Sequence, residues 1–444
     1  MAHSTLTVSD FQYRQAFRSL IPARLCREAI QATTRRSMRQ RLLPPWLLLP
    51  LLIVWFFRPE ARLSFIARWF HSSSRSLPSD PSLYRARARL GWRPLRWLRH
   101  RLVRFLAEPQ QDCDAFYQGH RLLAIDGTIL TVADTQANDR CFGRSRNQHR
   151  HSGYPLARVV ALAELATHAL IRWVTRTYRR SEQNLAMRLL PHVPPGALLL
   201  ADRGFHCYDW WHLANQRHFE LLLRVKKGPK FLAETRCSDG SVLSWVSPRR
   251  GKNKKQRQIR VRVIAYEWTD EKGKVHTSRL LTSLLDCQLH PARTLVNLYH
   301  RRWEQEGIFR EIKSQLTSRT TQIRAEEPLR VLQEIEGLLM GHYVLRWVML
   351  QAAREKGIPA VEVSFRGAVR IVQLRLRSMP KKPQARKKWW QEVLKAMGNE
   401  RVEKRRGRRC PRVRKVTRSH WPVKKPSDQE QPPVSFQITP HPLC

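Results

Sequence analysis

Three acidic side chains stand where a fold could gather them for chemistry. Asp126 follows the apolar run LLAI, and Asp202 follows the apolar run ALLLA. Acids directly after buried strands lie at sheet edges, where clefts form. Mg²⁺ binds through one or two carboxylates together with substrate phosphates. Two such acids therefore predict metal-assisted phosphoryl transfer, in which two cations about 3.5–4 Å apart clamp the attacking and leaving oxygens.

A simpler interpretation stays open for each aspartate. A lone Asp is more often a turn or cap residue, and Asp-Gly is a turn signal in its own right. We therefore expect a strand, a turn at Asp126-Gly127 and a second strand within residues 121–134. Asp202 is followed by Arg203-Gly204, and it too is interpreted either as a metal ligand or as a turn or cap residue.

The third acid comes from the segment YHRRWEQEGIFREIKSQL, residues 299–316. We expect one helix over about 292–316, on which positions three, four and seven apart share a face. Glu306 then shares its stripe with one aromatic side chain and three cations, which are Tyr299, Arg302, Arg310 and Lys313. Glu304 and Glu311 lack such a row and are interpreted as ordinary surface charge. The alternative for Glu306 is a solvated, salt-bridged face, where each pair contributes about 0.2–0.5 kcal/mol.

The charge of the chain predicts a polyanionic partner. It has 444 residues, with 82 Lys and Arg against 35 Asp and Glu, for a net charge of +47 at pH 7. Nucleic acid is the commonest large polyanion, and an acidic membrane surface is the rival. Neutralising phosphates with Lys and Arg gives strong, salt-sensitive binding that carries little sequence information.

The cysteines and the one long apolar segment indicate the cellular compartment of the protein. The eight cysteines form no CxxC pair and no Cys/His cluster with zinc spacing, so we interpret them as reduced thiols in a cytosolic protein. The N-terminus lacks the basic, apolar and small-residue segments that follow one another in a secretory signal. Residues 42–57 carry no charge, but a spanning helix needs about 20 apolar residues. With three prolines, this segment predicts a buried helix, and a membrane span is the alternative.

Hydrophobic periodicity divides the chain. Residues 1–115 read as helical, and strands begin near 120 with a helix predicted at 181–193 after the N-cap Ser181. Residues 218–287 read as short strands separated by turns. A long apolar helix is expected at 329–357, and the chain is strongly basic after about 376.

The spacing of four residues resembles a known family. Tyr299, Arg302, Glu306 and Lys313 are separated by two, three and six residues, which is the Y-R-E-K signature of insertion sequence 4 transposases. IDGTILTVADTQANDRCFG resembles the block around that family's first aspartate, and ADRGF resembles the block around its second. The segment LPPWLLLPLLIVWFF is similar to the family's N-terminal region. The resemblance runs from about residue 10 to 425.

This resemblance implies an α/β fold: a ribonuclease H-like catalytic core interrupted by a β-rich insertion, with a helical N-terminal region and a basic C-terminal tail. It implies a catalytic, metal-binding triad of Asp126, Asp202 and Glu306, holding Mg²⁺ with Mn²⁺ as a substitute. Tyr299, Arg302 and Lys313 are implied to contact transposon-end DNA. The implied parts are a DNA-end-binding region at 1–115, the first part of the core at 116–217, the insertion at 218–288, the second part of the core at 289–375, and a DNA-contacting C-terminal region with a disordered tail at 376–444.

The implied function is that of a DNA transposase. It hydrolyses phosphodiesters at transposon ends and transfers the strand into target DNA. The partners would be double-stranded DNA, at the terminal inverted repeats and the target, and a second copy in a synaptic homodimer, with no membrane. The location would be the bacterial cytoplasm, at the nucleoid. A domesticated DNA-binding protein without catalysis and a metal-dependent nuclease without strand transfer are the alternatives.

Four further residues stay open. Some similar enzymes form a DNA hairpin and stack a tryptophan of the insertion on a flipped base, for which Trp245 and Trp268 are candidates. Glu164 and Asp134 are spare acids near the predicted site. Each either supports a metal ligand or is simply exposed.

Overall fold

The computed structural model describes most of the chain between residues 21 and 402 and one short strand beyond it. The described residues are 21–34, 44–70, 79–145, 153–226, 228, 231–248, 258–269, 275–315, 322–375, 380, 382–402 and 436–438. They fall into two compact units. The first comprises Met1–Leu200, Arg217–Phe219 and Arg301–Arg401, and the second comprises Ala201–Gln216, Glu220–His300 and Val402–Cys444.

The N-terminal part of the first unit is helical, as the periodicity predicts. Its elements are α2 (Ala23–Thr33), α3 (Pro45–Val54), η1 (Trp55–Phe57), α4 (Leu63–Phe70), α5 (Asp80–Leu90) and α6 (Arg93–Leu102). Every residue of α3 from Leu47 to Val54 is buried, which confirms the buried helix predicted within residues 42–57. Among the helices that the structure describes, none has the length and apolar content to cross a membrane.

The sheet of the first unit has the order β4-β3-β2-β5. Its strands are β2 (His120–Thr131), β3 (Leu156–Glu164), β4 (Ala169–Thr177) and β5 (Leu198–Ala201), and the short β1 (Phe116–Tyr117) pairs with β2. β2, β3 and β4 form an antiparallel meander. A turn at Thr167-His168 joins β3 to β4, and His168 adopts a φ of 56° there.

The predicted turn at Asp126-Gly127 is wrong. β2 runs straight through both residues, because Asp126 pairs with Ala161 and Gly127 with Val160 in a continuous ladder. Pairing along the whole of β3 therefore outweighs the local turn preference of Asp-Gly. The glycine serves a different purpose, since any Cβ at Gly127 would overlap the carboxyl group of Glu182.

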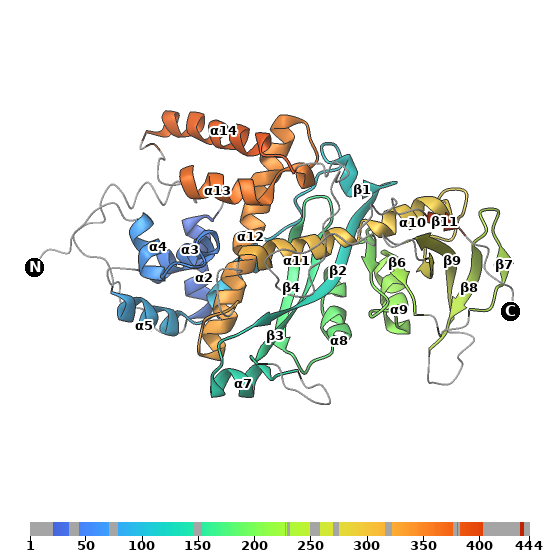
Figure 1. Cartoon of the computed structure of the whole chain (residues 1–444), viewed down its shortest axis with the longest axis horizontal. Coiled ribbons are helices and arrows are strands. Elements are labelled where there is room, and N and C mark those ends of the chain that lie inside the picture. The colour runs from blue at the N-terminus through green and yellow to red at the C-terminus, as the bar shows by residue number, and fades with distance from the viewer. Residues whose placement is uncertain are drawn as a thin grey trace, which may run out of the picture. The chain divides into compact units, whose positions relative to one another are not determined.

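Helices cover both faces of this sheet. α8 (Glu182–Met187) packs on β2 and β3, and Ser181 caps it by accepting a 3.1 Å hydrogen bond from the backbone N–H of Asn184, as predicted. On the other face, α11 (Trp303–Gln315) packs on β2, and α12 (Pro328–Lys356) packs on β4 (Figure 1). The remaining elements are η2 (Cys113–Ala115), α7 (Gln136–Phe142), η3 (Leu190–His192), η5 (Ala360–Glu362), α13 (Phe365–Arg375) and α14 (Pro383–Asn399).

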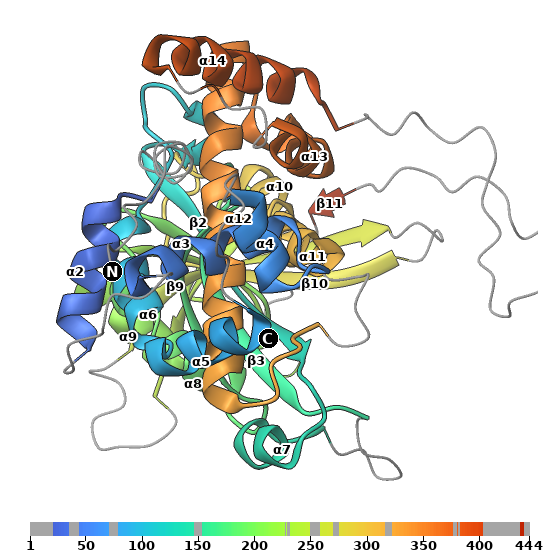
Figure 2. The ribbon, with the colours of Figure 1, turned by 90° about the vertical axis from the view of Figure 1, so that its left-hand side faces the viewer.

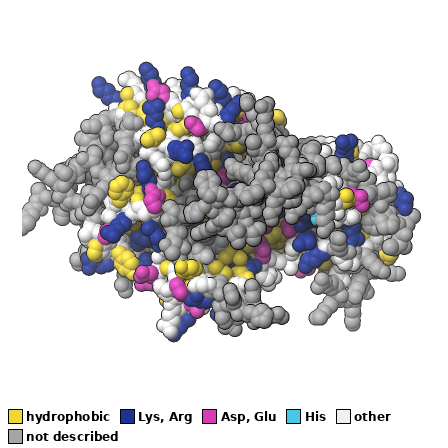
Figure 3. All heavy atoms as spheres, viewed as in Figure 1, with side chains coloured by type: hydrophobic (Ala, Val, Ile, Leu, Met, Phe, Trp, Pro, Cys, Tyr) yellow, Lys and Arg dark blue, Asp and Glu magenta, His cyan; other side chains and the backbone are white. Residues whose placement is uncertain are grey.

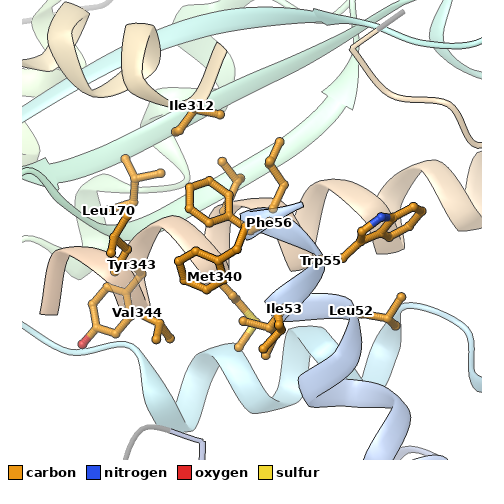
Figure 4. Close-up of a cluster of buried hydrophobic side chains, with 14 of the residues drawn as sticks. Leu52, Ile53, Trp55, Phe56, Leu170, Ile312, Met340, Tyr343 and Val344 are labelled. Atoms are coloured by element: carbon orange, nitrogen blue, oxygen red, sulfur yellow. The ribbon is translucent and has the colours of Figure 1, made fainter. Parts of the chain in front are cut away.

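α12 is the long helix predicted at 329–357, and the N-terminal helices pack directly on it (Figure 2). The contact is close because α12 has glycines one turn apart. A Cβ on Gly337 would lie 2.6 Å from Leu52 O, and one on Gly341 would lie 2.7 Å from Ile53 O. Around this contact, side chains of α3, η1, α12, β4 and α11 form one apolar cluster (Figure 4).

The second unit is mostly β, as predicted for residues 218–287. Its strands lie in the order β6-β10-β9-β8-β7: β6 (Glu220–Arg224), β10 (Val275–Thr282), β9 (Ile259–Thr269), β8 (Val242–Val246) and β7 (Thr235–Arg236). Each neighbouring pair is antiparallel, and β11 (Phe436–Ile438) also pairs with β9. The helices are α9 (Tyr208–Arg217) and α10 (Ala292–His300). The strongly basic part of the chain after about residue 376 is described only to residue 402, apart from β11, and α14 forms most of the described residues.

Replacing Gly341 by valine should destabilise the protein by about 1–3 kcal/mol or more, the usual cost of overpacking a core. The new side chain would push α3 and η1 away from α12, because backbone and Phe56 fill the space. Urea unfolding of the full chain measures this as a lower midpoint. Gly153→Ala is the control, since nothing lies within 4 Å of a Cβ there. Equal midpoints for the two variants would contradict the close contact.

Candidate active site

Two of the three predicted acids lie together in the first unit, joined by an arginine. Arg302 Nη1 lies 3.7 Å from Asp126 Oδ2, and Arg302 Nη2 lies 3.4 Å from Glu306 Oε1. The Arg302 side chain is only 5% exposed, while Asp126 is 20% and Glu306 49% exposed. Two carboxylates that share one cation on a partly open surface present oxygen ligands, the type that Mg²⁺ prefers.

The elements explain why these groups meet. Asp126 stands in the middle of β2, and cross-strand pairing puts it on the same face as Ala161 and Trp173. α11 and α12 cover this face, since Trp173 donates from Nε1 to Glu336 of α12 at 3.1 Å. Arg302 immediately precedes α11, and Glu306 lies in its first turn, where the helix dipole favours a negative charge.

The third predicted acid, Asp202, belongs to the second unit. Asp202 directly follows β5, as predicted, and its side chain is 31% exposed. Its Oδ1 lies 2.9 Å from Nη2 of Arg224, at the end of β6. Each candidate metal ligand is thus paired with an arginine within its own unit.

The single helix predicted over 292–316 is wrong. α10 ends at His300 and α11 begins at Trp303, so Tyr299 and Glu306 do not share a helical stripe. Tyr299 is 1% exposed, and its hydroxyl lies 3.5 Å from Ala201 O inside the second unit. Of the predicted stripe, α11 retains Glu306, Arg310 and Lys313. Lys313 is partly buried, and burial lowers its pKa.

Glu311 is not the ordinary surface charge that the helix pattern predicts. Three side chains surround its carboxylate in the first unit: His168, His342 and Arg346. His342 donates from Nε2 at 3.0 Å and Arg346 from Nε at 3.1 Å, with a second contact from Arg346 Nη2. His168 Nδ1 lies 3.0 Å from the other carboxylate oxygen. The side chain of Glu304 lies outside the described residues.

Burial and neighbouring charge decide the ionisation of this cluster. Burial alone would raise the pKa of Glu311, but the charge of Arg346 and the hydrogen bonds from both histidines hold it well below its usual value. Burial lowers the pKa of His342. A charged glutamate and a neutral His342 are therefore the resident forms. One sequence signal pointed here, because His342 and Arg346 are polar residues one turn apart in the mostly apolar stretch 337–350 of α12.

The two spare acids differ in their surroundings. Glu164 is fully buried and accepts from the backbone N–H groups of Leu106 and Ala107, at 3.2 and 3.0 Å, and from Arg121. It anchors the segment that leads from the N-terminal helices to the sheet, so the prediction that it is exposed or supports a metal ligand is not supported. Asp134 is exposed and pairs with Arg144.

The candidate tryptophans lie in the second unit with different neighbours. Trp245 is 39% exposed, with the guanidinium of Arg260 5.9 Å from its ring centre. Trp268 already stacks on His276 at 4.6 Å and donates from Nε1 to Ser278 at 3.2 Å. Trp245 is therefore the more open of the two.

One further group of possible metal ligands occurs among the described residues. Cys237, Asp239 and Cys287 place one ligand atom each within 4.8 Å of the others. The group was invisible in the cysteine spacing, because β8, β9 and β10 separate its members in sequence. Asp239 already pairs with the buried Arg262 and accepts from Ala292 N at 2.8 Å, so the carboxylate is committed to holding the start of α10.

Comparisons with known proteins identify the family of the chain. Residues 117–340 match the profile of the family described as "Transposase DDE domain". Residues 14–99 match the profile described as "Insertion element 4 transposase N-terminal". The chain therefore belongs to the family of DDE-domain transposases, of the insertion sequence 4 type, and is a DNA transposase. Its fold is the predicted α/β class, with a ribonuclease H-like core and a helical N-terminal region.

Two curated proteins of Escherichia coli K12 are similar in sequence. The transposase InsG of insertion sequence element IS4 is 29% identical over 311 residues, which is 69% of this chain and 70% of InsG. InsZ, a candidate transposase, is 25% identical over 209 residues, which is 46% of this chain and 68% of InsZ. The solved piggyBac transposase synaptic complex with hairpin DNA has a TM-score of 0.45 at 12% identity, covering 88% of this chain and 85% of that one. This last similarity is too weak to carry an argument.

Replacing Glu311 by glutamine should cost about 3–5 kcal/mol of stability, because it leaves the buried charge of Arg346 without its partner. Urea unfolding at neutral pH measures the loss. Glu355→Gln is the matched control, since Glu355 is an exposed glutamate of α12. A loss no larger than that of the control would show that the cluster does not hold α11.

Stability should fall on acidification in a defined window. Both folded-state pKa values are lowered, so the unfolded chain takes up protons first: His342 below about 6.5 and Glu311 below about 4.5. The contribution is complete above pH 6.5 and is lost as the pH falls toward the folded-state values. Unfolding midpoints measured from pH 7.5 to 5 should decline less steeply for His342→Gln than for the natural chain. Identical slopes would contradict this assignment.

Proposed function

We propose that Asp126, Asp202 and Glu306 are the catalytic carboxylates of this transposase and hold Mg²⁺, with Mn²⁺ as a substitute. The observation that carries the proposal is the sharing of Arg302 between Asp126 and Glu306, at 3.7 and 3.4 Å. Carboxylate oxygens are the donors that these hard cations bind. A bound divalent cation supplies Lewis acidity and lowers the pKa of bound water.

Chain connectivity supports the inclusion of Asp202. β5 is the neighbour of β2 in the order of strands, and Asp202 is the residue after β5 ends. Asp126 lies on β2 itself. Two acids carried by neighbouring strands suit one shared site, and each now rests against an arginine, which is Arg302 or Arg224.

Arg302 has two uses in this proposal. Without DNA, its buried guanidinium keeps two carboxylates from repelling each other. With DNA, the same fork can bind the phosphate next to the cleaved bond, because Arg matches phosphate oxygens in a bidentate geometry. Lys313 would add a positive charge on α11 about two turns beyond Glu306. The role of Tyr299 in DNA contact requires its ring to leave a buried position.

The remaining parts of the proposal come from the family. The chain would hydrolyse the phosphodiester at each transposon end, and the released 3′-hydroxyl would attack target DNA. The helical region 1–115 would bind the terminal inverted repeats, two copies would form the synaptic complex, and the work would take place at the nucleoid. Basic side chains lie on much of the described surface shown in Figure 3, which suits a long DNA substrate. The parts predicted at 116–217, 218–288, 289–375 and 376–444 stay predictions.

Replacing Glu306 by glutamine should slow cleavage of transposon-end DNA about 10²-fold or more, because the amide keeps the shape of the side chain and removes its negative charge. DNA affinity should hardly change. A gel assay of strand cleavage and a binding titration of the full chain, both with a duplex carrying the flanking inverted repeat, measure the two quantities.

Glu304→Gln is the matched control, because Glu304 lies two residues earlier on the same helix. It should cleave at the natural rate. Full cleavage by Glu306→Gln would refute the assignment of the third ligand. Absence of cleavage by the natural chain itself would instead favour the alternative of a non-catalytic DNA-binding protein.

A further inference from the structure

Eight basic side chains of the first unit lie near one another, apart from Asp126 and Glu306. They come from α6, β4, the segment after β4, the ends of α8 and α9, and η3. We call them the arginine face: Arg96, His100, Arg172, Arg176, Arg180, Arg188, His192 and Arg217. Six of them are exposed, and Arg172 and Arg176 are partly buried.

These side chains are close enough to repel one another. Beyond the effect of burial, the positive charges of Arg188, Arg96 and Arg180 lower the pKa of Arg176. Burial first, and then nearby arginines that include Arg172, lower the pKa of His100 to about 4. Burial and then Arg172, Arg99 and Arg217 lower the pKa of His192. A surface that repels itself in this way is stabilised by a polyanion.

No carboxylate of the described residues forms an ion pair with any member of the arginine face. Arg172 donates to the carbonyl oxygens of Val103 and Ile171, at 3.1 and 2.8 Å, and Arg176 donates to that of Thr175 at 2.8 Å. Elsewhere in the same unit, arginines do find acids: Arg24 pairs with Glu28 at 2.7 Å and Arg62 with Asp80 at 3.5 Å. The cations of the arginine face are thus left for a ligand.

The strand register separates this face from the candidate active site. Successive residues of a strand point to opposite faces of the sheet. Asp126, Ala161 and Trp173 are cross-strand partners and share the face covered by α11 and α12. Arg172 and Arg176 alternate with Trp173 and the buried Thr175, so they point to the opposite face, where α8 packs.

We propose that the arginine face is a second DNA-binding site, which holds the sugar-phosphate backbone of a duplex outside the cleaved bond. The proposal rests on the proposed function for its choice of polyanion. Arginine forks bind phosphate oxygens in pairs. Because the cations face away from Asp126, the phosphates bound here are different from the one that is cut.

The test compares two triple variants of the full chain with the same change in charge. Arg96, Arg180 and Arg188 become glutamine in the first, because all three are exposed. Arg24, Arg62 and Arg260 become glutamine in the second, because these arginines are 89%, 85% and 43% exposed and each pairs with an acid. Binding of a long duplex that lacks the terminal inverted repeats is titrated over a range of salt concentrations, so that the repeat binding proposed for region 1–115 does not enter the comparison.

The first variant should bind DNA about tenfold or more weakly at low salt. The slope of log affinity against log salt should fall by about 2 to 3, since each lost phosphate contact removes about 0.9. The second variant should stay within about threefold of the natural chain, because its arginines were already paired.

Three results would overturn the proposal. The first is equal affinity and slope in the two variants. The second is loss of binding to vesicles of anionic phospholipid with DNA binding intact. The third is a changed oligomeric state in sedimentation with DNA binding intact, which would point to a second copy of the chain as the occupant. Failure of the Glu306 assignment would leave this titration untouched, so the two proposals can fail separately.

Discussion

The position of α11 depends on one buried carboxylate. An uncompensated charge in the core costs several kcal/mol, so Glu311 can be buried only if its partners are in place. Those partners are His168, at the turn before β4, and His342 and Arg346, one turn apart on α12. The same short helix begins just after Arg302 and carries Glu306 in its first turn. The requirement to satisfy Glu311 thereby also places the groups that face Asp126.

α12 connects this cluster to the N-terminal region. Glu336 on α12 accepts from Arg99 of α6 at 3.0 Å and from Trp173 of β4 at 3.1 Å. Burial raises the pKa of Glu336, and the charge of Arg99 opposes that rise. The next residue, Gly337, and Gly341 one turn after it let α3 approach the backbone of α12. The N-terminal helices and the helix that carries Glu306 thus both pack against α12.

The sheet of the first unit also separates the candidate active site from arginines of the arginine face. Asp126, Glu306 and the Arg302 that neutralises them lie on the side of α11, while Arg172 and Arg176 of the arginine face point to the side of α8. In a chain with 82 basic and 35 acidic residues, acids are too few to pair every cation. The buried acids Glu164, Glu311 and Glu336 each pair with an arginine. The exposed arginines near α8 remain available to bind a polyanion.

Local pattern and spacing in the sequence determined the helical and β-rich regions, the buried α3, the long α12, the cap at Ser181 and the family, because each depends on residues near one another in the chain. Only the tertiary structure decided that β2 continues through Asp126-Gly127, that the helix breaks before Arg302, and that Glu311 is buried. Each of these depends on a partner far away in sequence, such as β3, α12 or the turn before β4. Cross-strand pairing and the cost of a buried charge then outweigh local preference.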